Sequence, residues 1–285
     1  MSLAAERDRF AETHPERAED VSGRRWGVVE TSGDGAGPAL VLLPGTLGRA
    51  DVFWRLMTRL AGRVHCMAVS YPAAHDLAQW GEDVLRLMDR SGVGEATVLG
   101  SSLGGYAAQW LAAARPDRLT RLIAANTLSD ASAVGTRPPY SGDLAAAPIG
   151  DLRDGFFRGL DAWAEAHPDQ RELTELLKAD AGGRIPEAEL RARLMALKHA
   201  PALPPPPLPP ERMAVIECED DPLIPEPMRA QVRAALRPAR VFRFREGGHF
   251  PYVSRPDPYA AAVAAVLGLG EPEGWEAAPD GALTA

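Results

Sequence analysis

The chain has 285 residues, a formal net charge of −8 at neutral pH and an apolar fraction of 46%. This length suits one α/β domain with an inserted piece. The apolar runs stay below the roughly 18 residues that a membrane helix needs, and the basic residues are scattered, which argues against a membrane span or a nucleic-acid surface. The expected partner is therefore a small molecule, and the sequence points to no protein partner.

The N-terminal residues and the cysteines predict a cytoplasmic protein. The first twenty residues, "MSLAAERDRFAETHPERAED", are charged and lack the apolar centre of a secretory signal. Cys66 and Cys218 lie in apolar runs without a neighbouring thiol or histidine at a metal-binding spacing. We expect two buried free thiols and no metal.

Strand-like and helical patterns alternate along most of the chain. In chain order the strand-like runs are "RRWGVVET", "ALVLLPG", "VHCMAVSYP", "ATVLGSS", "LTRLIAANTLS", "MAVIECED" and "ARVFRFREGG". Several are apolar throughout, as in strands that are buried on both faces of a parallel sheet. Amphipathic helices are expected between them, for example over 77–91, ending at Gly92. Repeated strand–helix–strand units predict a doubly wound α/β fold.

This alternation stops between residues 133 and 210, where helical patterns follow one another without a strand. We expect a helical cap there, closed by the extended linker "PALPPPPLPPE". A ligand for proline-binding domains is the alternative interpretation of that linker. The α/β core should therefore be discontinuous, over 21–132 and 211–270. A flexible leader is expected at 1–20 and a loose tail at 271–285.

The stretch "VLGSSLGGYAAQWLAAA" (98–114) contains a candidate nucleophile. Of its two serines, only Ser102 has glycine two residues before and two residues after, at Gly100 and Gly104. A strand-like run precedes this motif and a helical period follows it. A turn that joins a strand directly to a helix is strained and leaves no room for flanking side chains, which explains the glycines. The pattern predicts Ser102, not Ser101, as the nucleophile.

A serine hydroxyl needs a base within reach and an orienting group behind that base. His249 follows the last predicted strand in the glycine loop "REGGHFPY", at the sheet edge where open α/β sheets bind ligands. We predict that His249 is the base, and a buried structural histidine is the alternative. The remaining histidines are interpreted as structural, capping or solvated residues: His14, His65, His75, His167 and His199.

The orienting acid is expected in "VIECEDDPLIPEP", after the preceding strand. Asp221, directly before a proline, is the best placed, and Glu219 and Asp220 are close competitors. Asp130, after the strand that follows the nucleophile helix, is a further alternative. Either aspartate would serve if its carboxylate reached His249, whereas a solvated loop with a helix cap would carry no chemistry.

An oxyanion hole needs two backbone N–H groups that point at the developing charge. Leu103, directly after the predicted nucleophile, supplies one from a helix N-terminus. The second is expected in the loop after "ALVLLPG", where Gly45 permits a close approach and Thr46 or Leu47 presents its amide. A plain strand-ending turn is the alternative for this loop.

The order Ser102, Asp221, His249, with "LLPGTLG" upstream and a helical insertion, resembles the α/β-hydrolase superfamily across nearly the whole chain. The resemblance implies the α/β-hydrolase fold, with a mostly parallel eight-stranded sheet flanked by helices and a helical cap. It implies no metal or organic cofactor. By matching position it also implies that Thr46 and Leu103 form the oxyanion hole.

Within that superfamily the chain is similar to the maspardin group in "LLPGTLGRADVFWRL", "GSSLGGYAAQWLA", "NTLSDAS" and "GGHFPYVSR". That group is regarded as one of interaction proteins, with asparagine at the position of His249, so the histidine here favours an enzyme. We expect a serine hydrolase acting on a small ester, thioester or related acyl compound. The alternatives are a silent binding protein, an acyltransferase and a carbon–carbon hydrolase.

Overall fold

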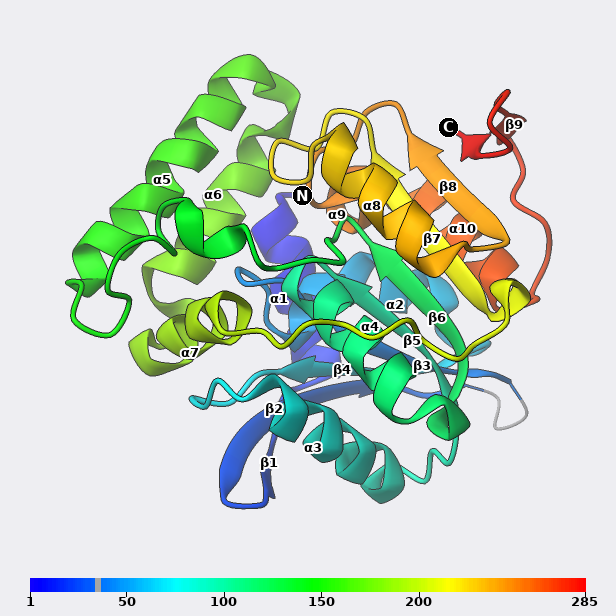
Figure 1. Ribbon diagram of the computed structural model, residues 1–285, viewed down its shortest axis with the longest axis horizontal. Helices are drawn as coiled ribbons and strands as arrows, with labels where there is room; N and C mark the ends of the chain where they lie inside the picture. Colours follow the sequence, from blue (N-terminus) through cyan, green and yellow to red (C-terminus); the bar gives the residue numbers. More distant parts are fainter. Residues whose placement is uncertain (34–36) are drawn as a thin grey trace.

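The computed structural model describes residues 1–33 and 37–285. Within them the chain forms one ten-stranded sheet in the order β1-β2-β4-β3-β5-β6-β7-β8-β10-β9 (Figure 1). Neighbours from β4 to β10 are parallel, whereas β1–β2, β2–β4 and β10–β9 are antiparallel. The strands are β1 (Arg17–Val21), β2 (Arg24–Thr31), β3 (Ala39–Leu43), β4 (His65–Ser70), β5 (Ala96–Ser101), β6 (Leu119–Ala125), β7 (Met213–Cys218), β8 (Arg240–Phe244), β9 (Glu276–Ala277) and β10 (Leu283–Thr284).

All seven predicted strand runs are present, as β2 to β8, and the prediction of a mostly parallel sheet flanked by helices is confirmed. The expected number of eight strands was too low, because the two-residue strands β9 and β10 extend the sheet beyond β8 in the described chain. The uniformly apolar runs follow from burial on both faces. In β3, Leu40 and Leu42 pack into one hydrophobic core, whereas Val41 and Leu43 pack into another. Because successive side chains of a strand point to opposite faces, a central strand needs apolar residues at every position.

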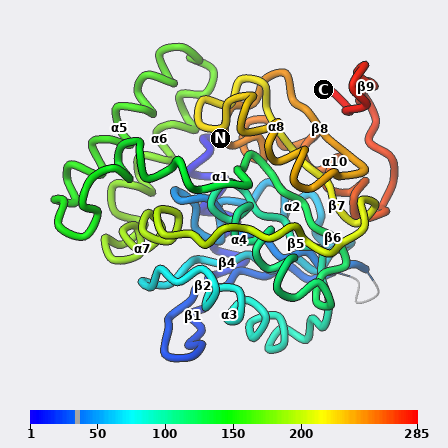
Figure 2. Tube along the Cα trace, in the orientation of Figure 1, coloured from blue at the N-terminus to red at the C-terminus, as the bar shows by residue number. Residues whose placement is uncertain are grey.

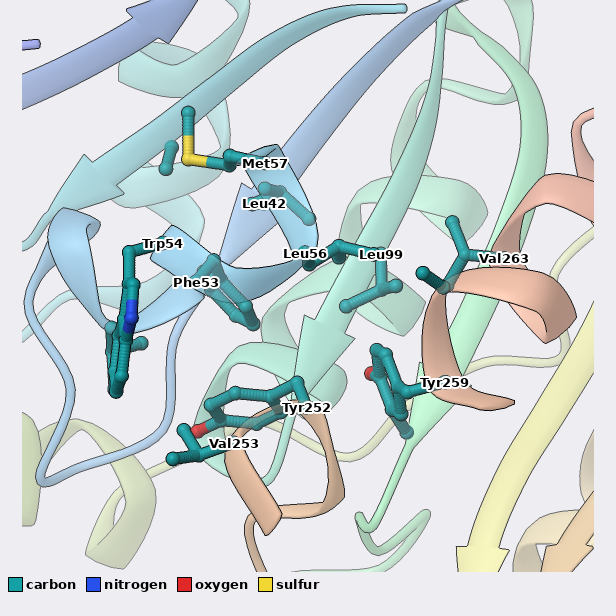
Figure 3. Close-up of a cluster of buried hydrophobic side chains, with 14 of the residues drawn as sticks. Leu42, Phe53, Trp54, Leu56, Met57, Leu99, Tyr252, Val253, Tyr259 and Val263 are labelled. Carbon is teal, nitrogen blue, oxygen red and sulfur yellow. The ribbon is translucent and has the colours of Figure 1, made fainter. Parts of the chain in front are cut away.

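Helices cover both faces of the sheet (Figure 1). The core that contains Leu42 includes side chains of α2 and α10, and Figure 3 shows Phe53, Tyr252 and Tyr259 within it. The opposite core includes side chains of α3, α4 and α8. These helices are α2 (Trp54–Leu60), α3 (Leu77–Arg90), α4 (Leu103–Ala114), α8 (Glu226–Leu236) and α10 (Pro256–Val266), and the short α9 (Pro251–Ser254) precedes α10.

The segment between β6 and β7 contains helices and turns but no strand. Its α-helices are α5 (Ile149–Ala166), α6 (Arg171–Ala179) and α7 (Glu187–Lys198), with a π-helical turn after α6 (Asp180–Arg184). We call residues 133–210 of this segment the cap. After α7 the proline-rich stretch runs back to β7, held by a hydrogen bond from Tyr106 Oη to the carbonyl of Pro201 (2.6 Å) and by the buried side chain of Leu208.

The expectation of a flexible leader was wrong. Residues 3–13 form α1 (Leu3–Thr13), which buries Phe10 and Arg7, and β1 pairs with β2 along its whole length. The leader has a polar pattern because only a few of its side chains are buried. Arg7 is one of them, and it pairs with Asp8 (2.9 Å) and with the buried Asp180 of the cap (3.4 Å), so its charge does not mark a solvated segment.

The expected loose tail is also partly ordered. β10 pairs with β8, and the Trp275 ring packs edge-on against Phe242 and Phe244 with centroid distances of 5.2 and 5.0 Å. Figure 2 follows the trace from the blue N-terminus near the cap to this red tail beyond β8. Two-residue strands have no detectable period, which is why the pattern predicted no structure here. Within the described residues, no helix combines the length and the apolarity needed to cross a bilayer.

Candidate active site

Ser102 stands at a strained turn between β5 and α4. Its backbone has φ 54° and ψ −119°, a region that side chains rarely adopt. A Cβ on Gly100 would lie 2.0 Å from the Gly104 carbonyl oxygen, and one on Gly104 would lie 2.0 Å from the Leu43 carbonyl oxygen. The two glycines of the motif are therefore sterically required.

The two adjacent serines have different surroundings. Ser101 is the last residue of β5, paired with Ala125 and 1% exposed. Ser102 is half-buried, and its backbone is fixed by β6 and the residues that follow it. Its amide donates to the Ala125 carbonyl (3.0 Å), and its carbonyl accepts from Thr127 Oγ1 (2.6 Å). This leaves Ser102 as the accessible hydroxyl of the pair.

His249 and Asp221 meet on the loops that follow β8 and β7. His249 Nδ1 lies 3.0 and 2.9 Å from the two carboxylate oxygens of Asp221, and both side chains are buried. Burial alone would raise the pKa of Asp221, but its interactions with His249, Asn126 and the Leu223 amide hold the pKa below its usual value. An ionised Asp221 can only accept, so Nδ1 of neutral His249 carries the proton and Nε2 is the basic nitrogen.

Asn126, directly after β6, connects these parts and was missed in the sequence. It is 2% exposed, and its Nδ2 donates to Asp221 Oδ2 (2.9 Å) and to the Gly248 carbonyl (3.3 Å). Its φ of 43° is left-handed, a conformation that asparagine tolerates better than most residues. An asparagine at the end of a predicted strand was the only signal available. Ser102 is hydrogen-bonded to both neighbours of Asn126, so the turn of the predicted nucleophile and the pair of His249 and Asp221 adjoin the same end of β6.

The competing acids do not contact His249. Asp220 accepts hydrogen bonds from the amides of Gly247 (3.0 Å) and Gly248 (2.9 Å) and so supports the histidine loop. Glu219 is exposed. Asp130 is exposed as well, and it accepts from the amide (2.8 Å) and the hydroxyl (2.9 Å) of Ser132. The alternative acid Asp130 is thus placed away from the base because its carboxylate closes a local turn of its own loop.

The remaining histidines have other surroundings. His65 Nε2 lies 3.2 Å from Glu30, whereas the rings of the others lie against aromatic neighbours. The ring pairs are His14 with Phe10, His75 with His199, and His167 with Trp163. His249 is therefore the one histidine of the described chain whose ring nitrogen contacts a buried carboxylate.

The loop after β3 approaches Ser102 closely. A Cβ on Gly45 would stand 3.1 Å from Ser102 Cβ, so a side chain at this position would crowd the serine. The loop turns within four residues, with the Gly48 amide donating to the Gly45 carbonyl (3.1 Å). Thr46 follows Gly45 directly, and Leu103 is the first residue of α4. Both predicted oxyanion-hole amides thus belong to backbone adjoining Ser102.

The cap packs onto the loop of His249. A Cβ on Gly248 would lie 2.9 Å from the Trp163 ring of α5 and 3.4 Å from Gln170 Oε1. Trp163 Nε1 donates to that same Gln170 oxygen (3.1 Å), and the Trp163 ring stacks on His167 at a centroid distance of 3.6 Å. The cap therefore covers the backbone next to His249.

A mostly parallel sheet whose central strand turns into a helix at a strained serine, with a histidine and an aspartate on later loops, is the architecture of an α/β hydrolase. Residues 40–262 match the family model described as "Alpha/beta hydrolase family", and the chain belongs to this family. The resemblance inferred from the sequence motifs is thereby confirmed.

Relatives and solved structures agree with this family. "Putative carbamate hydrolase RutD" of Caulobacter sp. (strain K31) is 27% identical over 246 residues, which cover 78% of this chain and 88% of that protein. Maspardin of Danio rerio is 21% identical over 240 residues, which cover 83% of this chain and 76% of that protein. The crystal structure of the enol-lactonase from Burkholderia xenovorans LB400 matches with a TM-score of 0.70 and 19% identity, over 88% of this chain and 100% of that one.

Proposed function

We propose that this protein is a serine hydrolase that cleaves a small ester, thioester or related acyl compound through an acyl-enzyme on Ser102. The observation that carries the proposal is the contact of 2.9 Å between buried His249 and buried Asp221, which Asn126 joins to the end of β6 where Ser102 is held in a strained turn. A structural histidine does not need an ionised aspartate on one nitrogen and an accessible serine nearby. An acid–base pair that activates a nucleophile needs both.

In the proposed mechanism, Ser102 Oγ attacks the substrate carbonyl carbon while His249 Nε2 takes its proton. Asp221 holds the imidazole in the required tautomer and stabilises the positive charge that forms on it. The tetrahedral intermediate collapses when the imidazolium returns the proton to the leaving oxygen or sulfur. Water, deprotonated by His249, then attacks the acyl-enzyme, and the imidazolium returns this proton to Ser102 Oγ as the acid leaves.

The amides of Leu103 and Thr46 are proposed to bind the oxyanion. The Leu103 amide lies at the N-terminus of a twelve-residue helix, where the first amides have no partner within the helix and the helix dipole favours negative charge. The close approach of Gly45 to Ser102 supports the second donor. Removal of one such donor from a serine protease costs about 10²–10³ in kcat.

The substrate class is inferred from the chemistry of this site and its relatives. The names of two matched proteins refer to a carbamate and to a lactone, and both compounds carry a carbonyl carbon bonded to a heteroatom, which a serine nucleophile can attack. The buried free thiols of Cys66 and Cys218 support a reducing compartment, and we propose the cytoplasm.

A second candidate is a binding protein without turnover, which the resemblance of the sequence motifs to the maspardin group implies, and a maspardin is among the relatives that match. The contact between His249 and Asp221 favours the enzyme, because a binding protein does not need a polarised imidazole. A third candidate passes the acyl group to an acceptor other than water or breaks a carbon–carbon bond on the same residues. Product analysis by mass spectrometry separates that candidate from hydrolysis.

The test is labelling with a fluorophosphonate probe, which reacts with activated serines. We expect wild type and Ser101→Ala to be labelled and Ser102→Ala to be unlabelled. On short p-nitrophenyl esters, kcat of Ser102→Ala should fall at least about 10⁴-fold. Equal labelling of both variants would refute the nucleophile assignment. An unlabelled wild type without turnover on esters, thioesters or carbamates would favour the binding protein.

A further inference from the structure

Arg193 of α7 is a fully buried cation between the cap and the core. Its side chain is 0% exposed, and its Nη1 donates to the carbonyls of Thr46 (3.1 Å) and Gly48 (2.7 Å). Its guanidinium carbon lies 5.6 Å from the ring centroid of Tyr71. The nearest acidic partner is Glu189, at 3.5 Å from Nη2.

These contacts differ from those of an arginine that only neutralises a buried acid. Burial lowers the pKa of Arg193 to about 10, so the side chain remains charged at neutral pH. A buried guanidinium is normally compensated by a close carboxylate. Here the two shorter contacts go to main-chain carbonyls of a single loop. The Glu189 carboxylate offsets part of the cost of burial, and the closest hydrogen bonds of Arg193 go to the loop of residues 44–48.

Hydrogen bonds also hold other carbonyls of the loop of residues 44–48. Tyr71 Oη donates to the Pro44 carbonyl (2.9 Å), and the Gly48 amide donates to the Gly45 carbonyl (3.1 Å). With the contacts of Arg193, the carbonyls of residues 44, 45, 46 and 48 are all fixed. Because each carbonyl shares a rigid plane with the next amide, fixed carbonyls also fix the directions of the loop amides.

We propose that Arg193 is a positioning residue that orders the oxyanion-hole loop. Its bond to the Thr46 carbonyl fixes the plane that carries the Leu47 amide, and its bond to the Gly48 carbonyl holds the turn whose Gly48 amide fixes the plane of the Thr46 amide. This proposal rests on the proposed function. A preorganised donor stabilises the developing oxyanion without reorganisation during the reaction. The guanidinium also places a fixed positive charge beside that loop. Arg193 does not touch the reacting atoms and acts through the backbone.

The experiment compares Arg193→Met, Arg193→Lys and the control Arg158→Met, which changes an exposed arginine of the cap helix α5. We expect Arg193→Met to lower kcat about 10- to 100-fold with KM within about threefold of wild type, since loss of a whole oxyanion donor costs about 10²–10³. Arg193→Lys keeps the charge but not the planar fork, and it should recover part of kcat. Arg158→Met should match wild type.

The rate of fluorophosphonate labelling gives a second measurement, because the phosphonyl oxygen also needs the oxyanion hole. It should fall in parallel with kcat. If Arg193→Met does not fold, Arg193→Lys carries the test, with an expected loss in kcat of about threefold or more at unchanged KM. A folded variant of either kind with wild-type kcat and labelling rate would overturn the proposal, as would a rise in KM alone. Failure of the proposed function gives a different result, since wild type itself would then be unlabelled and the proposal would fall with it.

Discussion

Two buried aspartates, Asp221 on the loop after β7 and Asp180 in the cap, have opposite pKa shifts. Asp221 Oδ1 accepts from the amides of Leu223 (2.8 Å) and Ile224 (3.1 Å), Oδ2 accepts from Asn126, and His249 contacts both oxygens. The pKa of Asp221 is lowered because these contacts outweigh burial.

In Asp180 the effect of burial on the pKa outweighs that of the contacts of its carboxylate. Its Oδ1 contacts Arg184 (2.6 Å) and Arg7 (3.4 Å), but Oδ2 has no hydrogen-bond partner within the described residues. Burial raises the pKa of Asp180 more than Arg184 lowers it, and the nearby Asp51 raises it further. A buried charge is therefore stabilised by donors on both oxygens and by the absence of a second acid, more than by the presence of arginines.

The largest effect on kcat should come from replacing Asp221 by its amide, and the same replacement of Asp180 is the comparison. We expect Asp221→Asn to lower kcat about 10⁴-fold, because the amide cannot hold His249 in the required tautomer. Asp180→Asn should stay within about threefold of wild type in the folded protein, since Asp180 bonds the cap and the N-terminal helix instead of the histidine. Ester hydrolysis measures both.

Asp130→Asn is the matched control, because it changes the exposed aspartate that competes with Asp221 in the sequence. Its kcat should equal that of wild type. A loss similar to that of Asp221→Asn would instead make Asp130 the orienting acid.

A smaller loss is expected when Asp221 keeps its charge but loses a donor. Asn126→Gly removes the amide that bonds Asp221 and tolerates the left-handed backbone, so kcat should fall about 10- to 100-fold without backbone strain. The control is Arg237→Gly, which places glycine at another left-handed position, at the exposed end of α8. The measurement is the steady-state kcat of the two variants. A wild-type kcat in Asn126→Gly would show that the hydrogen bond from Asn126 to Asp221 is dispensable.

The two aspartates also show what a sequence can reveal. Asp221 was a candidate because of the order of motifs along the chain, in which a strand is followed by an acidic cluster and then by a histidine in a glycine loop. The role of the glycines around Ser102 could also be predicted from the sequence, because the geometry of a single turn requires them. Such features depend on residues close together in the chain.

Asn126 and Arg193 could not be found in this way. Their contacts lie about 95 and 147 residues away, to Asp221 and Thr46, and an isolated asparagine or arginine has no periodicity. The N-terminal helix was misjudged for the same reason, since Arg7 is buried by its contact with Asp180. Apolar periodicity depends on residues that are close together in the sequence and can be recognised there. Contacts between polar groups far apart in the sequence exist only in the folded chain and leave no such pattern.

The smallest effect concerns the pH dependence of stability, which should have opposite signs for the two acids. Ionised Asp221, with a pKa below the usual value of about 3.9, stabilises the fold, and this contribution is present above pH 4 and is lost as the pH falls through its lowered pKa. Asp180, with a raised pKa, contributes stability below about pH 4 that is lost as the pH rises through its folded value. Each slope is limited to about 1.4 kcal/mol per pH unit.

Urea unfolding of wild type, Asp221→Asn and Asp180→Asn between pH 2.5 and 7, on the order of ten pH values, measures these contributions by difference. The free energy of unfolding of wild type minus that of Asp221→Asn should increase with pH below about 4 and then stay level. The corresponding difference in the free energy of unfolding for Asp180→Asn should decrease with pH above about 4. Ionisation of the buried Asp180 destabilises wild type, whereas the amide of the variant cannot ionise. If both differences change in the same direction, the number of donors on each carboxylate does not decide its pKa, and the contrast between the two acids has another cause.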